Sequence, residues 1–365
     1  MSAAPPELAP SFRRDLLSHV FRAIGAGRSC AVVGMCGAGL SNALRFVAER
    51  HVIDNYLNPI AAATLPVYLE TGWLTQPADL YRELIWQIGR AAETSHYPRA
   101  EQTALHYLGR QFDQGEAPDD LLSKAVTLVC RTPQHRLVLI LDEFDRPFQQ
   151  LPASMLRRLR QLRDEHKLRL CYVAGTHREL AQLARHDAAP DEAVSKFTEL
   201  FDEDTYPLKP YSCTDAHDML IRKTFDWRQR FTPDDEDRLY RLTGGHAKLL
   251  AAMLRLWEER RHLPLSSVER AAQQDQHLRR LCAAIWNDLE PVERFALLAL
   301  VTDRRGELQA GELDSLRRRG LIVGYPPGIF SMIFEAFIKT QDPVARSNQP
   351  TRPSRLRDLE ADMRW

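Results

Sequence analysis

The stretch of sequence that decides the fold is residues 29–46, SCAVVGMCGAGLSNALRF. A short apolar run leads into Gly34, and Gly39 follows with four residues between them, just before a stretch with helical spacing. This is the spacing of a phosphate-binding loop, GxxxxGK[ST]. Glycines let main-chain N–H groups converge on an anion, and the helix that begins beside them adds the partial positive charge of its N-terminus. We therefore expect the phosphates of a nucleotide to contact Gly34, Gly37, Ala38, Gly39, Leu40, Ser41 and Asn42.

One position of this loop departs from the motif. Leu40 stands where the motif has the lysine that bridges the outer phosphates, whereas Ser41 keeps the hydroxyl that ligates Mg²⁺. An aliphatic side chain neither donates a hydrogen bond nor neutralises charge, and phosphoryl transfer depends mainly on such charge stabilisation. We expect the loop to hold ATP or ADP through its main chain, with weakened affinity and weak or absent hydrolysis. A lone motif of this kind also fits an ordinary turn before a helix, so its surroundings decide between the two.

A second motif lies about a hundred residues further on. Residues 136–145, RLVLILDEFD, form an apolar strand that ends in two acidic residues. In a nucleotide-binding fold, Asp142 orients Mg²⁺ and Glu143 positions or deprotonates the attacking water. The plainer alternative is a strand end that happens to be acidic, but the upstream glycine loop favours the functional interpretation.

A third strand candidate, within LCYVAGTHREL at residues 170–180, ends at Thr176. Related ATPases place a polar sensor of the outer phosphate at such a strand end, so Thr176 or Arg178 is a candidate for that role. Thr176 fits equally well as a cap for the helix that follows. Both interpretations stay open.

Apolar runs alternate with helical patterns over the first 210 residues, which predicts a parallel sheet covered on both faces. The expected strands are residues 29–33, 65–69, 136–141 and 168–174, and the expected helices are 13–26, 41–50, 78–92, 100–112, 119–130 and 154–165. Beyond Pro210 we expect helices over 214–224, 233–242 and 247–259. The C-terminal part is expected to contain helices over 291–301 and 307–319, followed by short strands over 321–323 and 329–332. This last order is that of a winged helix.

The motifs GMCGAGLS, LILDEFD and YVAGTH, together with FTELFDEDTYPLKPYSCTDA and LTGGHAKLL, resemble the AAA+/STAND group of P-loop NTPases, including its origin-recognition-like branch. The resemblance covers residues 12–339. It implies an α/β fold with a P-loop parallel sheet, followed by a helical lid and a winged-helix domain. We expect the following division: a flexible N-terminal tail at 1–11, a nucleotide-binding domain at 12–209, a helical lid at 210–280, a winged helix at 281–340, and a flexible C-terminal tail at 341–365.

The segment LTGGHAKLL resembles the lid motif of this group, which carries a GxP turn or a basic sensor residue. Ala247 replaces the proline, whereas Lys248 falls at the basic position, where it would partly compensate for the missing loop lysine. A solvated helix residue is the alternative for Lys248, and His246 fits a packing residue. Residues 195–204 contain four acidic residues and no arginine, so they offer no arginine finger.

Composition excludes several classes of protein. Lys and Arg number 49, as do Asp and Glu, and the resulting neutral charge argues against a surface built throughout to bind nucleic-acid backbones. No apolar run approaches the roughly 18 residues of a membrane span, and no signal peptide is apparent. The six cysteines show neither a metal-binding nor a disulfide pattern. We expect a cytoplasmic protein.

Two functions are compatible with these patterns. The resemblance implies a signalling module, often in bacterial antiphage defence, that acts as a switch or scaffold with a separate effector or sensor protein, or as a homo-oligomer. The alternative is a winged-helix DNA-binding protein whose ATPase-like domain only oligomerises, motivated by Arg317–Arg319 and by four tail arginines at 346, 352, 355 and 357. Cations near a helix C-terminus are also favourable without DNA. A slow ATPase that uses Lys248 is a third possibility.

Overall fold

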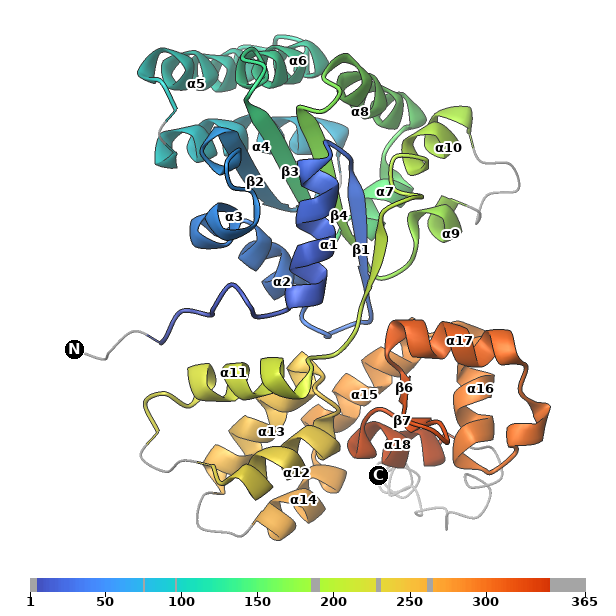
Figure 1. Ribbon diagram of the computed structural model, residues 1–365. Coiled ribbons are helices and arrows are strands. Elements are labelled where there is room, and N and C mark those ends of the chain that lie inside the picture. Colours follow the sequence, from blue (N-terminus) through green and yellow to red (C-terminus); the bar gives the residue numbers. More distant parts are fainter. Residues whose placement is uncertain are drawn as a thin grey trace, which may run out of the picture.

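The computed structural model describes residues 5–74, 76–95, 97–184, 191–227, 231–260 and 265–341. A sheet covered by helices forms one part, called here the sheet unit. A second part, mostly helical with a small two-stranded sheet, packs below it (Figure 1). The four tail arginines and all but Gln341 of the expected C-terminal tail lie outside the described residues, as do residues 1–4. Within the described part of the chain, no helix combines the length and apolarity that crossing a bilayer demands.

The sheet has five parallel strands in the order β2-β3-β4-β1-β5, which confirms the predicted α/β fold. Their bounds are β1 (Cys30–Gly34), β2 (Thr64–Glu70), β3 (Arg136–Asp142), β4 (Leu170–Thr176) and β5 (Thr205–Leu208). Strands β3 and β4 are apolar along almost their whole length because helices cover both faces of the sheet. Because all strands run the same way, their carboxyl ends meet at one edge, with Val33 of β1 opposite Thr176 of β4.

Alternate residues of β3 supply the two halves of the core. Val138 and Ile140 pack into the cluster that includes α1 (Arg14–Gly25), α2 (Leu40–Val47) and α3 (Arg50–Tyr56). Leu137, Leu139 and Leu141 pack into the opposite cluster. The helices of that second face are α4 (Pro77–Thr94), α5 (Arg99–Asp113), α6 (Pro118–Val129) and α8 (Ala153–Glu165). Shorter elements complete the sheet unit: η1 (Ala61–Ala63), α7 (Asp145–Gln150), α9 (Leu180–Ala184) and α10 (Glu192–Thr198).

The helical part follows β5. We call α11 (Cys213–Lys223), α12 (Pro233–Thr243), α13 (Ala247–Glu259) and α14 (Leu265–Gln274) the lid helices. The C-terminal unit contains α15 (Gln276–Asp288), α16 (Pro291–Val301), η2 (Arg305–Glu307), α17 (Ala310–Arg319), β6 (Ile322–Val323), β7 (Gly328–Ile329) and α18 (Met332–Lys339). Strands β6 and β7 pair antiparallel. One apolar cluster runs from α1 through the lid helices into α18, so these parts share a core.

Several local predictions need correction. The helix expected over 41–50 is two helices, because Glu49 adopts an extended conformation (ψ 133°) between α2 and α3. Strand β5 was not predicted, because it is an edge strand that contains Pro207 and follows acidic residues. The strand expected over 329–332 ends at Ile329, and α18 begins at Met332 because the Ser331 side chain accepts a hydrogen bond from the Phe334 N–H.

The N-terminal residues that precede α1 lie along the folded body. The Tyr56 hydroxyl donates to the Pro10 carbonyl at 3.0 Å, and Arg222 of α11 donates to the Pro6 carbonyl at 3.2 Å. The described part of the segment expected as a tail at 1–11 therefore contacts both the sheet unit and the lid helices.

Candidate functional site

The glycine-rich loop at residues 34–41, called here the phosphate loop, connects β1 to α2. Gly37 (φ +80°) and Gly39 (φ +94°) adopt left-handed conformations that favour glycine. A Cβ atom on Gly37 would lie 2.9 Å from both His246 Cε1 and Lys248 Cδ, so the loop packs closely beneath α13. The backbone conformation at both positions therefore favours glycine. This agrees with the motif, in which glycines leave the main-chain N–H groups exposed.

The acidic pair lies at the carboxyl end of β3. Asp142 is fully buried, and its two carboxylate oxygens accept hydrogen bonds from the Tyr68 hydroxyl at 2.6 Å and from the Glu143 N–H at 3.0 Å. Glu143 is exposed and has φ +54°, a strained value for a residue with a side chain. This geometry fixes Asp142 and turns the Glu143 side chain away from the core.

At the end of β4, three neighbouring residues have different surroundings. Thr176 is buried, and among the described residues its hydroxyl has no hydrogen-bond partner. The Asp145 carboxylate accepts from the His177 N–H at 2.7 Å and lies 3.1 Å from His177 Nδ1, and this contact raises the pKa of His177. Arg178 pairs with Glu290 at 3.0 Å, so its guanidinium is held against the C-terminal unit.

A hollow of about 380 Å³ gathers most of the residues expected to form a site, and its volume lies in the usual range of small-molecule sites. Its lining includes Gly37, Gly39, Leu40, Ser41, Asn42, Asp142, Glu143 and Lys248. Three of the expected site residues, Gly34, Ala38 and Thr176, are not part of this lining. The hollow also has contributors that sequence reasoning missed, among them His177, Tyr211 and Lys223.

Leu40 lies at the boundary between this hollow and the core. Its side chain is only 6% exposed and belongs to the apolar cluster that spans α1, α2 and the lid helices. The position that a phosphate-binding lysine occupies in the motif is thus filled by packed hydrocarbon. Among the residues that line the hollow, the lysines are Lys223 and Lys248, both from the lid helices.

Helix α13 is tied to the phosphate loop at two points. His246, its N-cap residue, accepts from the Leu249 N–H through Nδ1 (3.3 Å), so Nε2 carries the proton and donates to the Cys36 carbonyl at 3.0 Å. The Lys248 N–H donates to the Gly37 carbonyl at 3.1 Å. Burial lowers the pKa of His246 to about 4, which keeps the ring neutral. The description of His246 as a packing residue is therefore incomplete, because the ring links lid and loop.

Arg13 is a buried residue that the sequence analysis did not identify. Its guanidinium donates to the Ala38 carbonyl of the loop at 3.0 Å and to the Lys209 carbonyl at 2.6 Å, and it lies 4.1 Å from the centre of the Tyr211 ring. Its main-chain N–H donates to Asp215 of α11 at 2.8 Å. Arg13 thus joins the loop, the segment after β5 and the first lid helix. No local spacing in the sequence distinguishes it from its neighbour Arg14.

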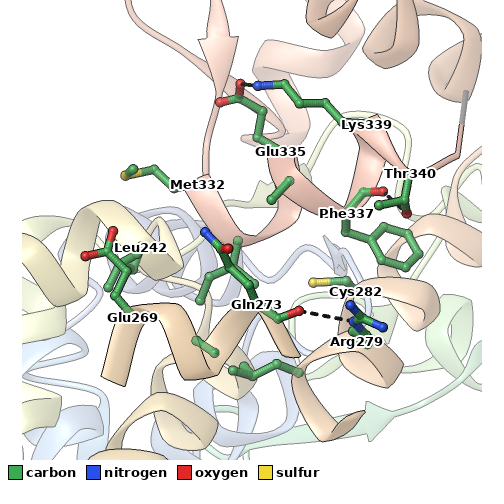
Figure 2. A pocket seen from close by; sticks show the side chains of 14 residues that line it. Leu242, Glu269, Gln273, Arg279, Cys282, Met332, Glu335, Phe337, Lys339 and Thr340 are labelled. Carbon is green, nitrogen blue, oxygen red and sulfur yellow. Dashed lines mark hydrogen bonds and ion pairs between the residues drawn. The ribbon is translucent and has the colours of Figure 1, made fainter. Parts of the chain in front are cut away.

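A larger hollow, of about 940 Å³, lies between α14, α15 and α18 (Figure 2). Its charged residues are engaged within the chain: Lys339 pairs with Glu335 at 2.6 Å, Arg279 donates to the Gln273 carbonyl at 3.1 Å (Figure 2), and Glu269 pairs with Arg238 of α12. Apolar side chains such as Leu242, Leu278 and Ile333 form much of the remaining wall. This chemistry does not suit a polyphosphate, so the hollow at the loop is the candidate functional site.

Comparisons with known proteins agree with this geometry. Residues 15–183 match a family model described as an AAA domain. The ORC2 protein of Aeropyrum pernix, solved as ADPNP–ADP complexes, is 16% identical with a TM-score of 0.54, over 93% of this chain and 96% of that one. The Walker-type ATPase PABY2304 of Pyrococcus abyssi is 11% identical with a TM-score of 0.55, over 90% and 96%. No curated protein matches the sequence. The likeness confirms, at the level of the fold, the resemblance to origin-recognition-like P-loop NTPases.

Proposed function

We propose that this chain, whose residues 15–183 match an AAA domain, is a regulatory module that binds ADP or ATP and hydrolyses ATP weakly or not at all. The observation that carries the proposal is Leu40: the loop keeps its glycines and lies in one hollow with Asp142 and Glu143, but an apolar side chain replaces its cation. Binding by main-chain N–H groups survives that replacement, whereas stabilisation of a transferring phosphoryl group does not.

In this proposal the loop N–H groups from Gly34 to Asn42 hold the phosphates. Lys248 contacts them from the lid, because it lines the same hollow. Thr176 senses the outer phosphate: its buried hydroxyl lies beside the loop strand and lacks a partner among the described residues. Glu143 orients the water in whatever hydrolysis remains.

Mg²⁺ is a second expected ligand. Magnesium prefers oxygen donors and usually contacts one or two carboxylates together with the phosphates. Ser41 and Asp142 line the hollow together and supply such oxygens, so the residues fit the ion. Bound there, Mg²⁺ neutralises phosphate charge. The chain's own contribution is to hold the Asp142 carboxylate in place through Tyr68.

We further propose that the lid helices and the C-terminal unit, a winged helix in its order of elements, report the state of the phosphate site. The main-chain contacts of His246 and Lys248 with the loop give the lid a direct connection to any bound phosphate. The signal and the effector then come from a separate protein or from a second copy of this chain. The chain itself then acts as a switch or a scaffold.

Three measurements on the full purified chain test the proposal. Mass spectrometry of nucleotide released by denaturation is expected to find ADP or ATP, and calorimetry with each nucleotide and Mg²⁺ is expected to show binding. A matched control is Gly37→Val, which forces a side chain into a left-handed position beside His246 and Lys248 and should abolish binding. A phosphate-release assay checks hydrolysis. Turnover of roughly 1 per second or more would contradict impaired catalysis.

A second candidate function is DNA binding by the winged helix. The observation that favours it is the turn between β6 and β7, where Tyr325 is 95% exposed on the same unit as the exposed Arg318. The neighbouring arginines are engaged within the chain: Arg317 pairs with Asp314 at 3.6 Å and Arg319 with Glu293 at 2.5 Å. A salt-dependent gel shift with mixed-sequence DNA tests this function, and no shift at low salt would exclude it.

A further inference from the structure

We infer that Asp288 makes the phosphate site selective for a nucleoside diphosphate over a triphosphate, because its carboxylate occupies a place at the loop that an outer phosphate would need. The inference rests on the proposed function and names the ligand class that the site prefers. It concerns a contact between segments 252 residues apart in the sequence, the phosphate loop and the end of α15.

The contact is a hydrogen bond to the loop itself. The Cys36 N–H donates to Asp288 Oδ2 at 3.2 Å. Main-chain N–H groups of such a loop are the donors that bind phosphate oxygens. A carboxylate oxygen is an anionic acceptor of the same kind. One donor of the loop is thus already satisfied by a negative charge from the chain's own C-terminal unit.

The Asp288 carboxylate is held in place by a partly buried ionic cluster. Arg319 at the end of α17 lies 3.4 Å from Asp288 Oδ2 and 2.5 Å from Glu293 Oε2. The side chains of Asp288 and Arg319 are only 16% and 18% exposed, so water screens them weakly. Two carboxylates share one guanidinium, and the cluster therefore keeps a net negative charge beside the loop.

A second carboxylate reaches the same corner of the site. Glu143 lines the same hollow as Cys36, whose N–H donates to Asp288. Burial raises the pKa of the Cys36 thiol, Lys248 lowers it, and Asp288 and Glu143 raise it further. In P-loop enzymes the residue at the position of Glu143 orients the water that attacks the outermost phosphate. The outermost phosphate of a triphosphate therefore belongs in the corner that Asp288 and Glu143 share.

The negative charge of this corner then gives a diphosphate and a triphosphate different affinities. A diphosphate ends before this corner, whereas a triphosphate brings further negative charge next to two carboxylates. The loop lysine that normally neutralises that charge is replaced by Leu40, which is buried in the core, so among the residues that line the hollow Lys223 and Lys248 are the lysines left to offset it. A triphosphate can enter fully only when Asp288 leaves the Cys36 N–H, so its binding and the docking of α15 compete for the same donor.

The test is calorimetry on the full chain with ADP and with a non-hydrolysable ATP analogue, each with Mg²⁺. Asp288→Asn keeps the shape and an acceptor oxygen but removes the charge. We expect it to leave the ADP affinity within about twofold and to raise the affinity for the ATP analogue roughly tenfold or more, the scale of a hydrogen bond to a charged group. Asp314→Asn is the control, because Asp314 lies in the same unit with its side chain 71% exposed, and we expect no change.

Asp288→Ala provides a second variant that also removes the acceptor, with the same expected direction, and a thermal unfolding curve checks that each variant is folded. If the wild-type chain binds nucleotide and the ratio of the two affinities is the same in wild type and in both variants, the inference is wrong while the proposed function stands. If neither the wild type nor any variant binds either nucleotide, the proposed function fails and this inference fails with it.

Discussion

His246 offers a quantitative test of the connection between the lid and the phosphate loop. The ring is 1% exposed, donates to the Cys36 carbonyl and accepts from the Leu249 N–H in the first turn of α13. Asparagine is an equally good helix N-cap, but its side chain is too short to make both contacts. His246→Asn therefore preserves the cap and removes the contact with the loop. From the lost hydrogen bond and the lost packing we expect the free energy of unfolding to fall by about 1–3 kcal/mol at pH 7.5.

The pH dependence of that loss has a definite sign. Burial lowers the pKa of His246 to about 4 in the folded chain, against about 6.5 for a histidine in an unfolded chain. The stability associated with the neutral ring is fully present above about pH 6.5 and is lost progressively down to about pH 4. At about 1.36 kcal/mol per pH unit, it amounts to about 3 kcal/mol over the whole interval. The pKa of His177 is raised, so its contribution has the opposite sign, but it is common to wild type and variant.

Urea unfolding at pH 7.5 and at pH 5.0 measures both quantities. Between these values the wild type loses about 2 kcal/mol that the variant cannot lose, so the difference in stability should shrink by that amount and can change sign. A matched control is Thr103→Ala in α5, where an exposed hydroxyl that donates to the Arg99 carbonyl is removed; because no titratable side chain changes, the difference should not depend on pH. If the difference between wild type and His246→Asn is the same at both pH values, His246 is not a buried neutral ring and the lid is not docked as described.

Three further substitutions probe other contacts of the site. Leu40→Lys restores the cation and should raise the affinity for ATP with Mg²⁺ about tenfold in calorimetry. Leu40→Ala, which removes the same core packing, should give no gain. A negligible effect of the lysine would indicate that Lys248 already supplies the charge. Tyr68→Phe removes the donor to Asp142 and should lower the free energy of unfolding by about 1–2 kcal/mol in urea titrations, and an unchanged value would contradict that hydrogen bond. Arg13→Lys keeps the charge but loses the forked contacts with two carbonyls, so we expect a loss of about 2–3 kcal/mol by the same assay, and no loss would argue against the buried position of Arg13.

Elements with a strong internal pattern could be predicted from the sequence. Strands β3 and β4 are nearly continuous apolar runs because both of their faces are buried, and the glycine loop fixes β1 and α2 around it. Strand β5 could not be recognised, because Pro207 and the acidic residues before it weaken the strand pattern at an edge position. The start of α18 depends on Ser331, whose hydroxyl also donates to the Leu242 carbonyl in α12 at 2.7 Å. That second contact arises only in the folded chain.

The residues of the candidate site likewise fall into those that could be predicted from the sequence and those that could not. Asp142, Glu143 and the loop could be brought together by reasoning alone, because the carboxyl ends of parallel strands share one edge. Arg13, His246 and Asp288 reach the loop from segments outside the sheet, and each is a single polar residue in an ordinary helical or connecting stretch. Their position depends on how the lid helices and the C-terminal unit pack against the sheet, which no local spacing specifies.

The contacts of the loop with the rest of the chain suggest how binding can act without hydrolysis. Its main chain is held by side-chain or main-chain groups from three regions: Arg13 before α1, His246 and Lys248 in the lid, and Asp288 in the C-terminal unit. The chain itself therefore holds the loop from three sides. Of the four residues, only Asp288 accepts a hydrogen bond from a main-chain N–H of the loop, and main-chain N–H groups also bind phosphate. The other three donate to carbonyl groups of the loop. A ligand shifts a conformational equilibrium only by its differential affinity for the two states. In the competition that we infer at Asp288, exchange of a diphosphate for a triphosphate would shift the docking equilibrium of α15 without breaking a bond in the nucleotide.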